Sequence, residues 1–216
     1  IESSFRYGAE LAEGLRNRVY NEVIPLLCEE IAKGLGSSLP SKKDLKEIYD
    51  LSLLTLFRLL FIAYSEDRNL LPYKSNEEYK RNSLQTISKA ILGINLNSLH
   101  EDRSSSYWTQ LKQLFNAVHD GNKLWGVPAY GGNIFSSDKK ISSLGSKLEK
   151  LNLENSSIVR ILQNLLIADG PEGPQPIDFR SLSVREFGSI YEALLESELV
   201  FAKEDLIVEK ASGLYR

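Results

Sequence analysis

The chain has 216 residues, of which 42% are hydrophobic and 25% are charged. This length suits one large domain, which buries about 70% of the surface that its unfolded chain exposes. The formal net charge of -3 lacks the basic excess of a dedicated nucleic-acid-binding surface. The single cysteine, Cys28, excludes an internal disulfide and fits a reducing compartment, so we expect a cytoplasmic protein. No apolar segment follows a basic N-terminus, so neither a signal peptide nor a membrane anchor is expected.

Residues 5 to 33 are predicted to form a long amphipathic helix. Its apolar stripe repeats every four residues, at Leu11, Leu15, Val19, Val23, Leu27 and Ile31. Pro25 is expected to bend this helix, because a proline inside a helix loses one backbone hydrogen bond and crowds the preceding turn. Gly34 and Gly36 offer a left-handed end to the helix, and residues 37 to 40 are expected to be a connector.

The stretch from Leu45 to Pro72 is the segment around which we expect the other segments to pack. Its apolar residues would cover every side of a helix, which is the pattern of a buried helix; they include Leu51, Leu53, Leu54, Leu56, Phe57, Leu59, Leu60, Phe61 and Ile62. Ser41 and Asp44 form a capping pair at its start. Arg58 interrupts the apolar run, and the uninterrupted part falls short of the roughly 20 residues that a bilayer requires, which argues against a membrane span.

Further helices are predicted where apolar periodicity follows a capping residue. They lie at about residues 76 to 92, 106 to 119, 155 to 168 and 184 to 197, with a short helical turn at residues 144 to 151. Ser75 with Glu78 and Ser183 with Glu186 have the spacing of capping boxes. Asn155 is expected to cap the helix that starts beside it.

Two stretches rich in proline and glycine separate these helices. Residues 122 to 137, NKLWGVPAYGGNIFSS, also contain aromatic side chains and predict an ordered, packed loop. Residues 170 to 176, GPEGPQP, contain three prolines and two glycines, which forbid a helix and favour an extended, exposed crossing. Two short β-prone runs around Lys203, Glu204 and Asp205 are predicted to form a hairpin.

These elements predict a mainly α fold, a multi-helix bundle around a buried central helix with a small C-terminal β-hairpin. Residues 1 to 169 would form the bundle, and residues 170 to 216 would form the crossing, the last helix and the hairpin. We expect both parts to belong to one compact unit.

Few side chains in this sequence suggest catalysis or metal binding. His119 and Asp120 could orient a general base, but a histidine near a helix end more often satisfies free carbonyl groups. Cys28 has no Cys or His nearby, and the two acids that follow it would raise its pKa. Gly131 and Gly132 lack the lysine and the hydroxyl residue of a phosphate-binding loop. We therefore expect no catalytic, cofactor-binding or metal-binding residue in this chain.

Charged residues gather towards the C-terminal end of the central helix, at Arg58, Glu66, Asp67 and Arg68. Two carboxylates beside an arginine could be a catalytic pair. Acids in the last turn of a helix oppose its dipole, however, so they need partners. We expect the two arginines to hold the two acids in a structural network of salt bridges and hydrogen bonds.

Basic residues recur on the predicted surface, at Lys42, Lys43, Lys46, Lys80, Arg81, Lys89, Lys139, Lys140, Lys147 and Lys150. They could contact DNA phosphates if they shared one face of the domain. Acids are interspersed among them, which favours a solvated surface. The sequence therefore assigns DNA-backbone contacts to no particular residue.

Three stretches together resemble a known family. Residues 57 to 72, FRLLFIAYSEDRNLLP, are similar to the segment LLFLLFAEDRGLLP. Residues 127 to 135, VPAYGGNIF, are similar to lPaYgGgLF, and residues 177 to 196, IDFRSLSVREFGSIYEALLE, to iDyrdLgvrhLGsiYEgLLE. Such stretches occur, in this order and at similar spacings, in the α-helical region that precedes the methyltransferase domain of type IIG restriction-modification enzymes and related adenine-specific DNA methyltransferases. The resemblance covers about residues 50 to 216, and its third stretch is the most specific.

The resemblance implies that this chain is a connector and not the catalyst. In such proteins the following methyltransferase domain carries a GxyYTP segment, an FxGxG-type loop for S-adenosylmethionine and an NPPY-type motif, none of which occurs in this sequence. S-adenosylmethionine is thus expected as a cofactor of the parent protein and not of this fragment. The implied partners are DNA, through the parent protein, and the methyltransferase domain in cis, with no membrane. Phe187, Tyr191 and Glu192 are the candidate residues for docking that domain.

Two other functions stay open on the sequence. A free-standing helical adaptor would bind a protein partner through the aromatic loop at residues 125 to 135. An independent nucleic-acid-binding module would bind DNA with an affinity that falls as salt is added.

Overall fold

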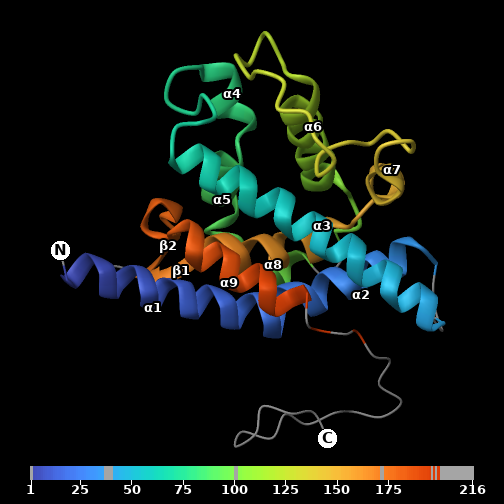
Figure 1. The fold of residues 1–216 in the computed structure, drawn as a ribbon, viewed down its shortest axis with the longest axis horizontal. Coiled ribbons are helices and arrows are strands. Elements are labelled where there is room, and N and C mark those ends of the chain that lie inside the picture. The colour runs from blue at the N-terminus through green and yellow to red at the C-terminus, as the bar shows by residue number, and fades with distance from the viewer. Residues whose placement is uncertain are drawn as a thin grey trace, which may run out of the picture.

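Helices make up most of the protein in the computed structural model, which describes residues 2 to 36, 41 to 99, 102 to 170, 173 to 195, 197 and 199. They surround helix α3 (Lys42–Asp67), and a two-stranded antiparallel sheet lies towards the C-terminal end (Figure 1). The predicted fold class, mainly α with a small hairpin, is confirmed. The predicted connector at residues 37 to 40 and the predicted hairpin around Lys203 lie outside the described residues.

The N-terminal helical segment changes its winding just before Pro25. Helix α1 (Glu2–Arg18) leads into a π-helical turn (Val19–Val23) and then into α2 (Ile24–Gly34). The amide of Ile24 donates to the carbonyl of Val19, five residues back. Pro25 then lies in the first turn of α2, where a backbone amide needs no helical partner. The proline is accommodated by a π-turn.

The π-turn also keeps the four-residue apolar stripe on the buried side. On a regular α-helix each step of four residues rotates the stripe by about 40°, so five steps would carry it about 200° round the helix. One extra residue in a turn sets the stripe back by about 100°. Leu15, Val19, Val23, Leu27 and Ile31 are accordingly all fully buried.

Helix α3 is the core of the fold, as the sequence predicted. Ser41 and Asp44 form a reciprocal capping box at its start. From Ile48 to Glu66 its residues are buried except along one partly buried stripe, which consists of Asp50, Leu54, Phe57, Phe61 and Tyr64. Within the described residues, α3 is long and apolar enough to cross a membrane by length and composition, so the interruption at Arg58 does not exclude a span. Burial is what distinguishes it: 72% of its apolar window lies inside the fold, which is consistent with the core helix of a soluble protein.

Helix α3 ends in a Schellman motif. Asn69 adopts a left-handed φ of 57°, and its amide donates to the carbonyl of Glu66 at 3.1 Å. The amide of Leu70 donates to the carbonyl of Ser65 at 2.8 Å. The carbonyl of Leu70 in turn accepts the hydroxyl of Tyr130 at 2.7 Å, so the chain leaves α3 along a fixed path.

The single helix predicted at residues 76 to 92 is wrong, because the structure has two short helices there. Helix α4 (Glu77–Asn82) is capped by Asn76 and not by Ser75. Helix α5 (Leu84–Ile91) starts again at Ser83, whose hydroxyl accepts a backbone amide of the next turn. The break points the first amides of α5 towards the C-terminal end of α3.

After a 3-10 turn (Leu96–Leu99), helices α6 (Ser106–Asp120), α7 (Ser143–Lys150) and α8 (Asn155–Leu166) lie close to their predicted positions. The loop at residues 122 to 137 is ordered and packed, as predicted. It buries Val127, Phe135 and Ser136, and the amide of Tyr130 donates to the carbonyl of Val118.

Two of these helices are capped by side chains from elsewhere in the chain. Asn155 does not cap α8 as predicted; its Oδ1 accepts the amide of Tyr107 at 3.1 Å and so caps α6. The start of α8 is capped by the buried Glu30 of α2, which accepts the amide of Glu154 at 2.9 Å and the hydroxyl of Ser157 at 2.7 Å. Sequence rules for capping consider near neighbours only, so they miss such partners.

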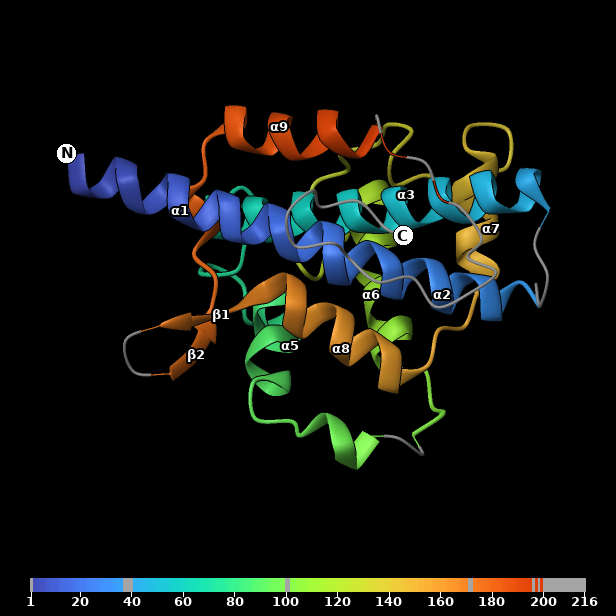
Figure 2. The same ribbon diagram turned by 90° about the horizontal axis from the view of Figure 1, so that it is seen from below.

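The extended segment predicted at residues 170 to 176 takes part in a β-hairpin, formed by β1 (Ile167–Gly170) and β2 (Gly173–Pro176). Figure 2 shows this hairpin projecting from the body of the protein. Its extended conformation agrees with the prediction, whereas its antiparallel pairing was not predicted.

The prolines of β2 occupy positions where they remove no ladder hydrogen bond. The amide of Ile177 donates to the carbonyl of Leu166. Hydrogen-bonded residue pairs alternate with non-bonded pairs in an antiparallel ladder, so the next bonded pairs are Ala168 with Gln175 and Gly170 with Gly173. Pro174 and Pro176 fall between them, where the backbone faces away from β1. The outer edge of β2 therefore offers no amide to another strand, which protects it from edge-to-edge association.

Helix α9 (Val184–Leu195) follows a short 3-10 turn (Phe179–Ser181) and lies alongside α1 in Figures 1 and 2. It begins with the predicted capping box of Ser183 and Glu186. Ile190 and Leu194 are buried, and the Tyr49 hydroxyl of α3 donates to the carbonyl of Leu194 at 2.6 Å. Helix α9 thus shares the core of the bundle.

We expect Gly145→Ala to lower the free energy of unfolding by about 2–3 kcal/mol in urea denaturation, because α7 has no room for a methyl group there. A Cβ at Gly145 would lie 1.9 Å from the carbonyl oxygen of Ser136. The matched control is Gly14→Ala in α1, where nothing lies within 4 Å and alanine should stabilise the helix by about 0.5–1 kcal/mol. Similar effects of the two substitutions would contradict the packing argument.

Candidate functional site

Aromatic rings on one stripe of α3 bring three segments that lie far apart in the sequence into contact. Phe57 packs against Tyr191 of α9 with ring centroids 4.9 Å apart. Phe61, one turn later, packs against Phe135 of the loop after α6 at 5.3 Å. Tyr64 completes the stripe. We call residues 57 to 72, 127 to 136 and 177 to 195, which these contacts join, the α3 junction.

The second contact between α3 and α9 runs through Phe187. Its ring meets Tyr64 edge-on at 5.1 Å and stacks on Phe179 at 6.3 Å. Such aromatic pairs add about 0.5–1.5 kcal/mol each beyond the area that they bury. The third stretch is therefore held on α3 at two successive turns.

Glu66 is the buried acid of the α3 junction. Its carboxylate accepts the hydroxyl of Tyr79 at 2.7 Å and the amides of Leu84 and Gln85 at 2.8 Å each. It thereby caps α5 from the end of α3. Burial raises the pKa of Glu66 to about 7. The three hydrogen bonds lower the pKa, but the effect of burial is larger.

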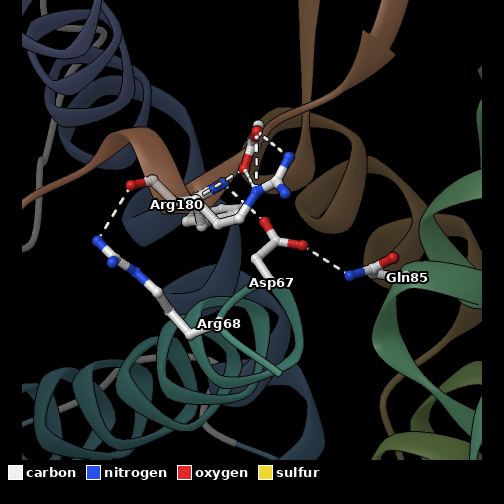
Figure 3. A network of polar contacts seen from close by, with 6 residues as sticks. Asp67, Arg68, Gln85 and Arg180 are labelled. Carbon is white, nitrogen blue, oxygen red and sulfur yellow. Dashed lines mark hydrogen bonds and ion pairs between the residues drawn. The ribbon is translucent and has the colours of Figure 1, made fainter. Parts of the chain in front are cut away.

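Asp67 and Arg68 tie α3 to the segment before α9, as Figure 3 shows. The Asp67 carboxylate accepts the side-chain amide of Gln85 at 2.6 Å and the backbone amide of Phe179 at 2.7 Å. Burial raises the pKa of Asp67. Arg68 reaches across the same segment and donates to the carbonyl of Arg180 at 3.1 Å.

Arg58 lies apart from this network and holds the loop after α6. Its Nε donates to the carbonyl of Ile134 at 2.6 Å and its Nη2 to that of Ser136 at 3.2 Å. Its guanidinium lies over the rings of Phe115 and Phe135, 5.3 and 5.8 Å from their centroids. Only 2% of Arg58 is exposed, and burial lowers its pKa to about 10, so it keeps its charge at neutral pH.

The salt bridges expected within this group of four residues are not found. In the described part of the chain neither Arg58 nor Arg68 forms an ion pair with Glu66 or Asp67. Each acid instead accepts amides at the start of a following element, and each arginine donates to carbonyls of a loop. These side chains satisfy backbone groups that helices and loops leave free, and they do so across long sequence separations.

The three predicted docking residues have different surroundings. Phe187 is partly buried against Tyr64. This packing within the chain accounts for an aromatic residue at this position, and no docked domain is needed to explain it. Tyr191 covers Phe57 with one face yet is 46% exposed, and Glu192 is exposed beside it. Tyr191 and Glu192 therefore present the outer face of α9 to solvent.

No predicted alternative site is assembled by the fold within the described residues. His119 Nε2 lies 3.8 Å from the carboxylate of the neighbouring Asp120 at the end of α6, where the His119 side chain is only 18% exposed. Cys28 is buried among apolar side chains, and burial raises its pKa to about 11, which disfavours the reactive thiolate. No group of three His, Cys, Asp or Glu residues is placed to hold a metal ion there.

Several of the basic residues have partners within the chain. Lys80 and Arg81 pair with acids of their own helix, at 3.2 and 2.7 Å. Lys147 pairs with Glu47, and Lys89 donates to the hydroxyl of Tyr73. This pairing of lysine with nearby acids or hydroxyls fits the predicted solvated surface.

The sequence prediction missed Tyr79 and Gln85, which donate hydrogen bonds to Glu66 and Asp67 of the α3 junction. The available signal was Ser83, a good N-cap residue in the middle of the helix predicted at residues 76 to 92. A helix start at that position would have required an anionic or polar partner for its amides. The nearest candidate, Glu66, lies in another helix.

Replacing Arg68 by alanine should lower the melting temperature by about 2–4 °C, because about 1 kcal/mol of hydrogen bonding and stacking on Tyr64 is lost. Differential scanning fluorimetry would measure the shift. Arg81→Ala is the matched control, since it removes only an exposed pair with Glu78. An unchanged melting curve for the Arg68 variant would rule out its structural role.

The geometry of the α3 junction suits rigid attachment and recognition, with buried charges used for capping and an exposed tyrosine on α9. No protein-family model, curated protein or solved structure matches this chain. A function for the chain is therefore inferred from its own residues and from the resemblance of its three stretches.

Proposed function

We propose that this chain is a non-catalytic helical connector of a DNA adenine-N6 methyltransferase or restriction-modification enzyme. The observation that carries the proposal is the convergence of the three family-like stretches in the α3 junction. They lie far apart in the sequence, and the second and third both pack on α3, which contains most of the first. Packing of this kind is what a shared role would require.

A connector of this kind holds catalytic and DNA-recognition modules at a fixed separation. The α3 junction supports such rigidity, because α3 is bonded to α5 through Glu66, to the segment before α9 through Asp67, and to the loop after α6 through Arg58. A packed unit transmits position between modules better than a flexible linker does. The connector would act in the cytoplasm, with DNA as a partner through the parent protein and S-adenosylmethionine as the cofactor of the parent.

The outer face of α9 is the proposed docking surface for the methyltransferase domain. Tyr191 and Leu195 lie on it with 46% and 55% of their surface exposed, and Glu192 adds a charge. Tyrosine at the centre of an interface contributes a large contact area with little loss of side-chain entropy.

The chain by itself should neither bind S-adenosylmethionine in titration calorimetry nor transfer a methyl group to DNA. Reading the gene beyond the codon for Arg216 provides the complementary test, with YTP and NPPY motifs expected in the same frame. Cofactor binding by the chain would contradict its connector role. A stop codon directly after Arg216 would support a free-standing protein instead.

If the motifs are found, the domain that carries them serves as the binding partner in an interface test. Tyr191→Asp should weaken its association with this chain at least tenfold, because it places a charge in the core of the interface. Ser189→Asp is the matched control, since Ser189 is an exposed residue two positions earlier, about half a turn round α9 from Tyr191. Equal affinities of the two variants would exclude this face of α9.

A free-standing adaptor is the second candidate. It is favoured by exposed apolar side chains on the loop after α6, where Leu124 and Tyr130 are 70% and 41% exposed. Apolar side chains clustered at a surface are typical of protein-binding sites. Leu124→Ser would abolish partner capture by an adaptor, and it would leave docking of a methyltransferase domain on α9 unchanged.

A further inference from the structure

A small cavity lies beside the C-terminal end of α3, between α5 and the segment before α9. It has a volume of about 200 Å³. Its apolar wall consists of buried side chains from four parts of the chain, namely Ala63, Leu84, Leu166, Ile177 and Phe179. The space equals that of about seven water molecules in the liquid, so it suits an organic molecule of about seven non-hydrogen atoms.

Two acids of α3, Glu66 and Asp67, line the same cavity. An ionised carboxylate offers about four acceptor positions, and Asp67 uses two of them, for the side chain of Gln85 and the amide of Phe179 (Figure 3). In the part of the chain that the structure describes, neither acid has an ion-pair partner. Burial raises the pKa of both acids, so a cation in the cavity would stabilise their charged forms.

The two cations at the edge of the cavity are already engaged. Lys89 donates to the hydroxyl of Tyr73 at 2.9 Å and lies over its ring. Arg180 forms a two-pronged ion pair with Asp178, with nitrogen–oxygen distances of 2.6 and 2.9 Å. Lys89 and Arg180 are both exposed, so water and salt screen their charges, whereas Glu66 is fully buried. The cavity therefore favours a positively charged ligand over a negatively charged one.

Ser88 supplies a further polar group to the cavity. It is 4% exposed, and within the described residues its hydroxyl has no hydrogen-bond partner. Leu84, Gln85 and Lys89 also line the cavity, and Ser88 shares their face of α5, so its side chain points towards the cavity. A buried hydroxyl without a partner is rare in a folded protein, and a ligand in the cavity would provide the partner.

We propose that this cavity is a binding site for a small organic amine, in its ammonium form, with a short apolar body. The ammonium group donates hydrogen bonds to Asp67 and Ser88, and the apolar body packs on Leu84, Leu166 and Ile177. The bound amine bridges α3, α5 and the segment before α9. This inference goes beyond the proposed connector function and does not depend on it, because it concerns a cavity inside this chain.

Amide NMR of the nitrogen-15-labelled 216-residue chain, titrated with three probes of one branched carbon skeleton, tests the proposal. The probes are 3-methylbutylamine, 3-methylbutan-1-ol and 3-methylbutanoate, at pH 8, above the pKa of Glu66. We expect the amine to shift the amides of Ser88, Lys89 and Phe179 with a dissociation constant on the order of 1 mM, at least tenfold tighter than the other probes. Equal binding of the alcohol, tighter binding of the carboxylate, or no shift with any probe would each overturn the proposal.

Two substitutions locate the bound amine. Ser88→Leu fills the cavity and Asp67→Asn removes a charge from it, so each should weaken amine binding at least tenfold. Glu77→Gln is the matched control for charge, since this exposed acid of α4 pairs with Lys80 and does not line the cavity. Urea denaturation of each variant shows whether the fold is kept, and the comparison of the three probes requires no variant. Amine binding that both substitutions leave unchanged would overturn the proposal.

Discussion

Arg58→Ala is expected to lower the free energy of unfolding by about 3–5 kcal/mol, measured by urea denaturation. The substitution removes a fully buried side chain and leaves a cavity between Phe115 and Phe135. It also leaves the carbonyls of Ile134 and Ser136 without a donor in a place that water reaches poorly. The loop after α6 should loosen as a result.

Two further substitutions separate these contributions. Arg58→Met fills most of the cavity but donates no hydrogen bond, whereas Arg58→Lys keeps the charge but loses the planar, forked donor geometry. Both should be more stable than Arg58→Ala and less stable than the original protein. Arg103→Ala, at an exposed arginine in a loop, is the control and should change stability by less than about 0.5 kcal/mol. Equal effects of Arg58→Ala and Arg103→Ala would refute the role of Arg58 as the anchor of the loop.

Glu66→Ala should destabilise the protein by about 3–5 kcal/mol in the same measurement. It leaves three donors unsatisfied, the hydroxyl of Tyr79 and the amides of Leu84 and Gln85. Helix α5 would also lose the side chain that accepts its first amides. Glu78→Ala, at an acid of α4 whose side chain is 43% exposed, is the matched control and should have little effect. If the two variants unfold alike, the capping of α5 by Glu66 is not important for stability.

The pH dependence of stability tests the protonation of Glu66. Its pKa is raised from 4.5 to about 7 by burial, so between these values the folded state holds a proton that the unfolded state has released. The free energy of unfolding should therefore fall as pH rises from about 4.5 to 7, by up to about 3 kcal/mol for this group. Glu66→Gln should abolish this part of the pH dependence, as urea denaturation at pH 5 and pH 7.5 would measure. A rise in stability over this range, lost in the variant, would mean that the hydrogen bonds outweigh burial.

The buried helix α3 and the capping boxes at Ser41 and Ser183 could be predicted from the sequence because their causes are local. An apolar run without a polar face must be buried, and a serine three residues before an acid can exchange hydrogen bonds with it whatever surrounds them. The extended conformation of residues 173 to 176, GPQP, has a local cause as well, since proline restricts its own backbone.

The break at Ser83 and the cap of α8 by Glu30 could not be predicted in this way. Both depend on a carboxylate of another helix. The sequence around the helix start contains the amides that need a partner but not the carboxylate that accepts them. The partners of Arg58 illustrate the same limit. Its charge suggested an acidic partner, yet packing put it beside two carbonyls and two rings, which satisfy a guanidinium without an acid.

By itself the sequence determined most of the helical segments of this protein and the central place of α3. Only the tertiary structure decided that residues 127 to 136 and 177 to 195 pack on α3 in one junction, and that Glu66, Asp67 and Arg68 bind backbone groups rather than one another. The physical reason is that helix formation depends on side chains a few residues apart, whereas the ends of helices are satisfied by whichever polar groups the packing of distant segments brings near.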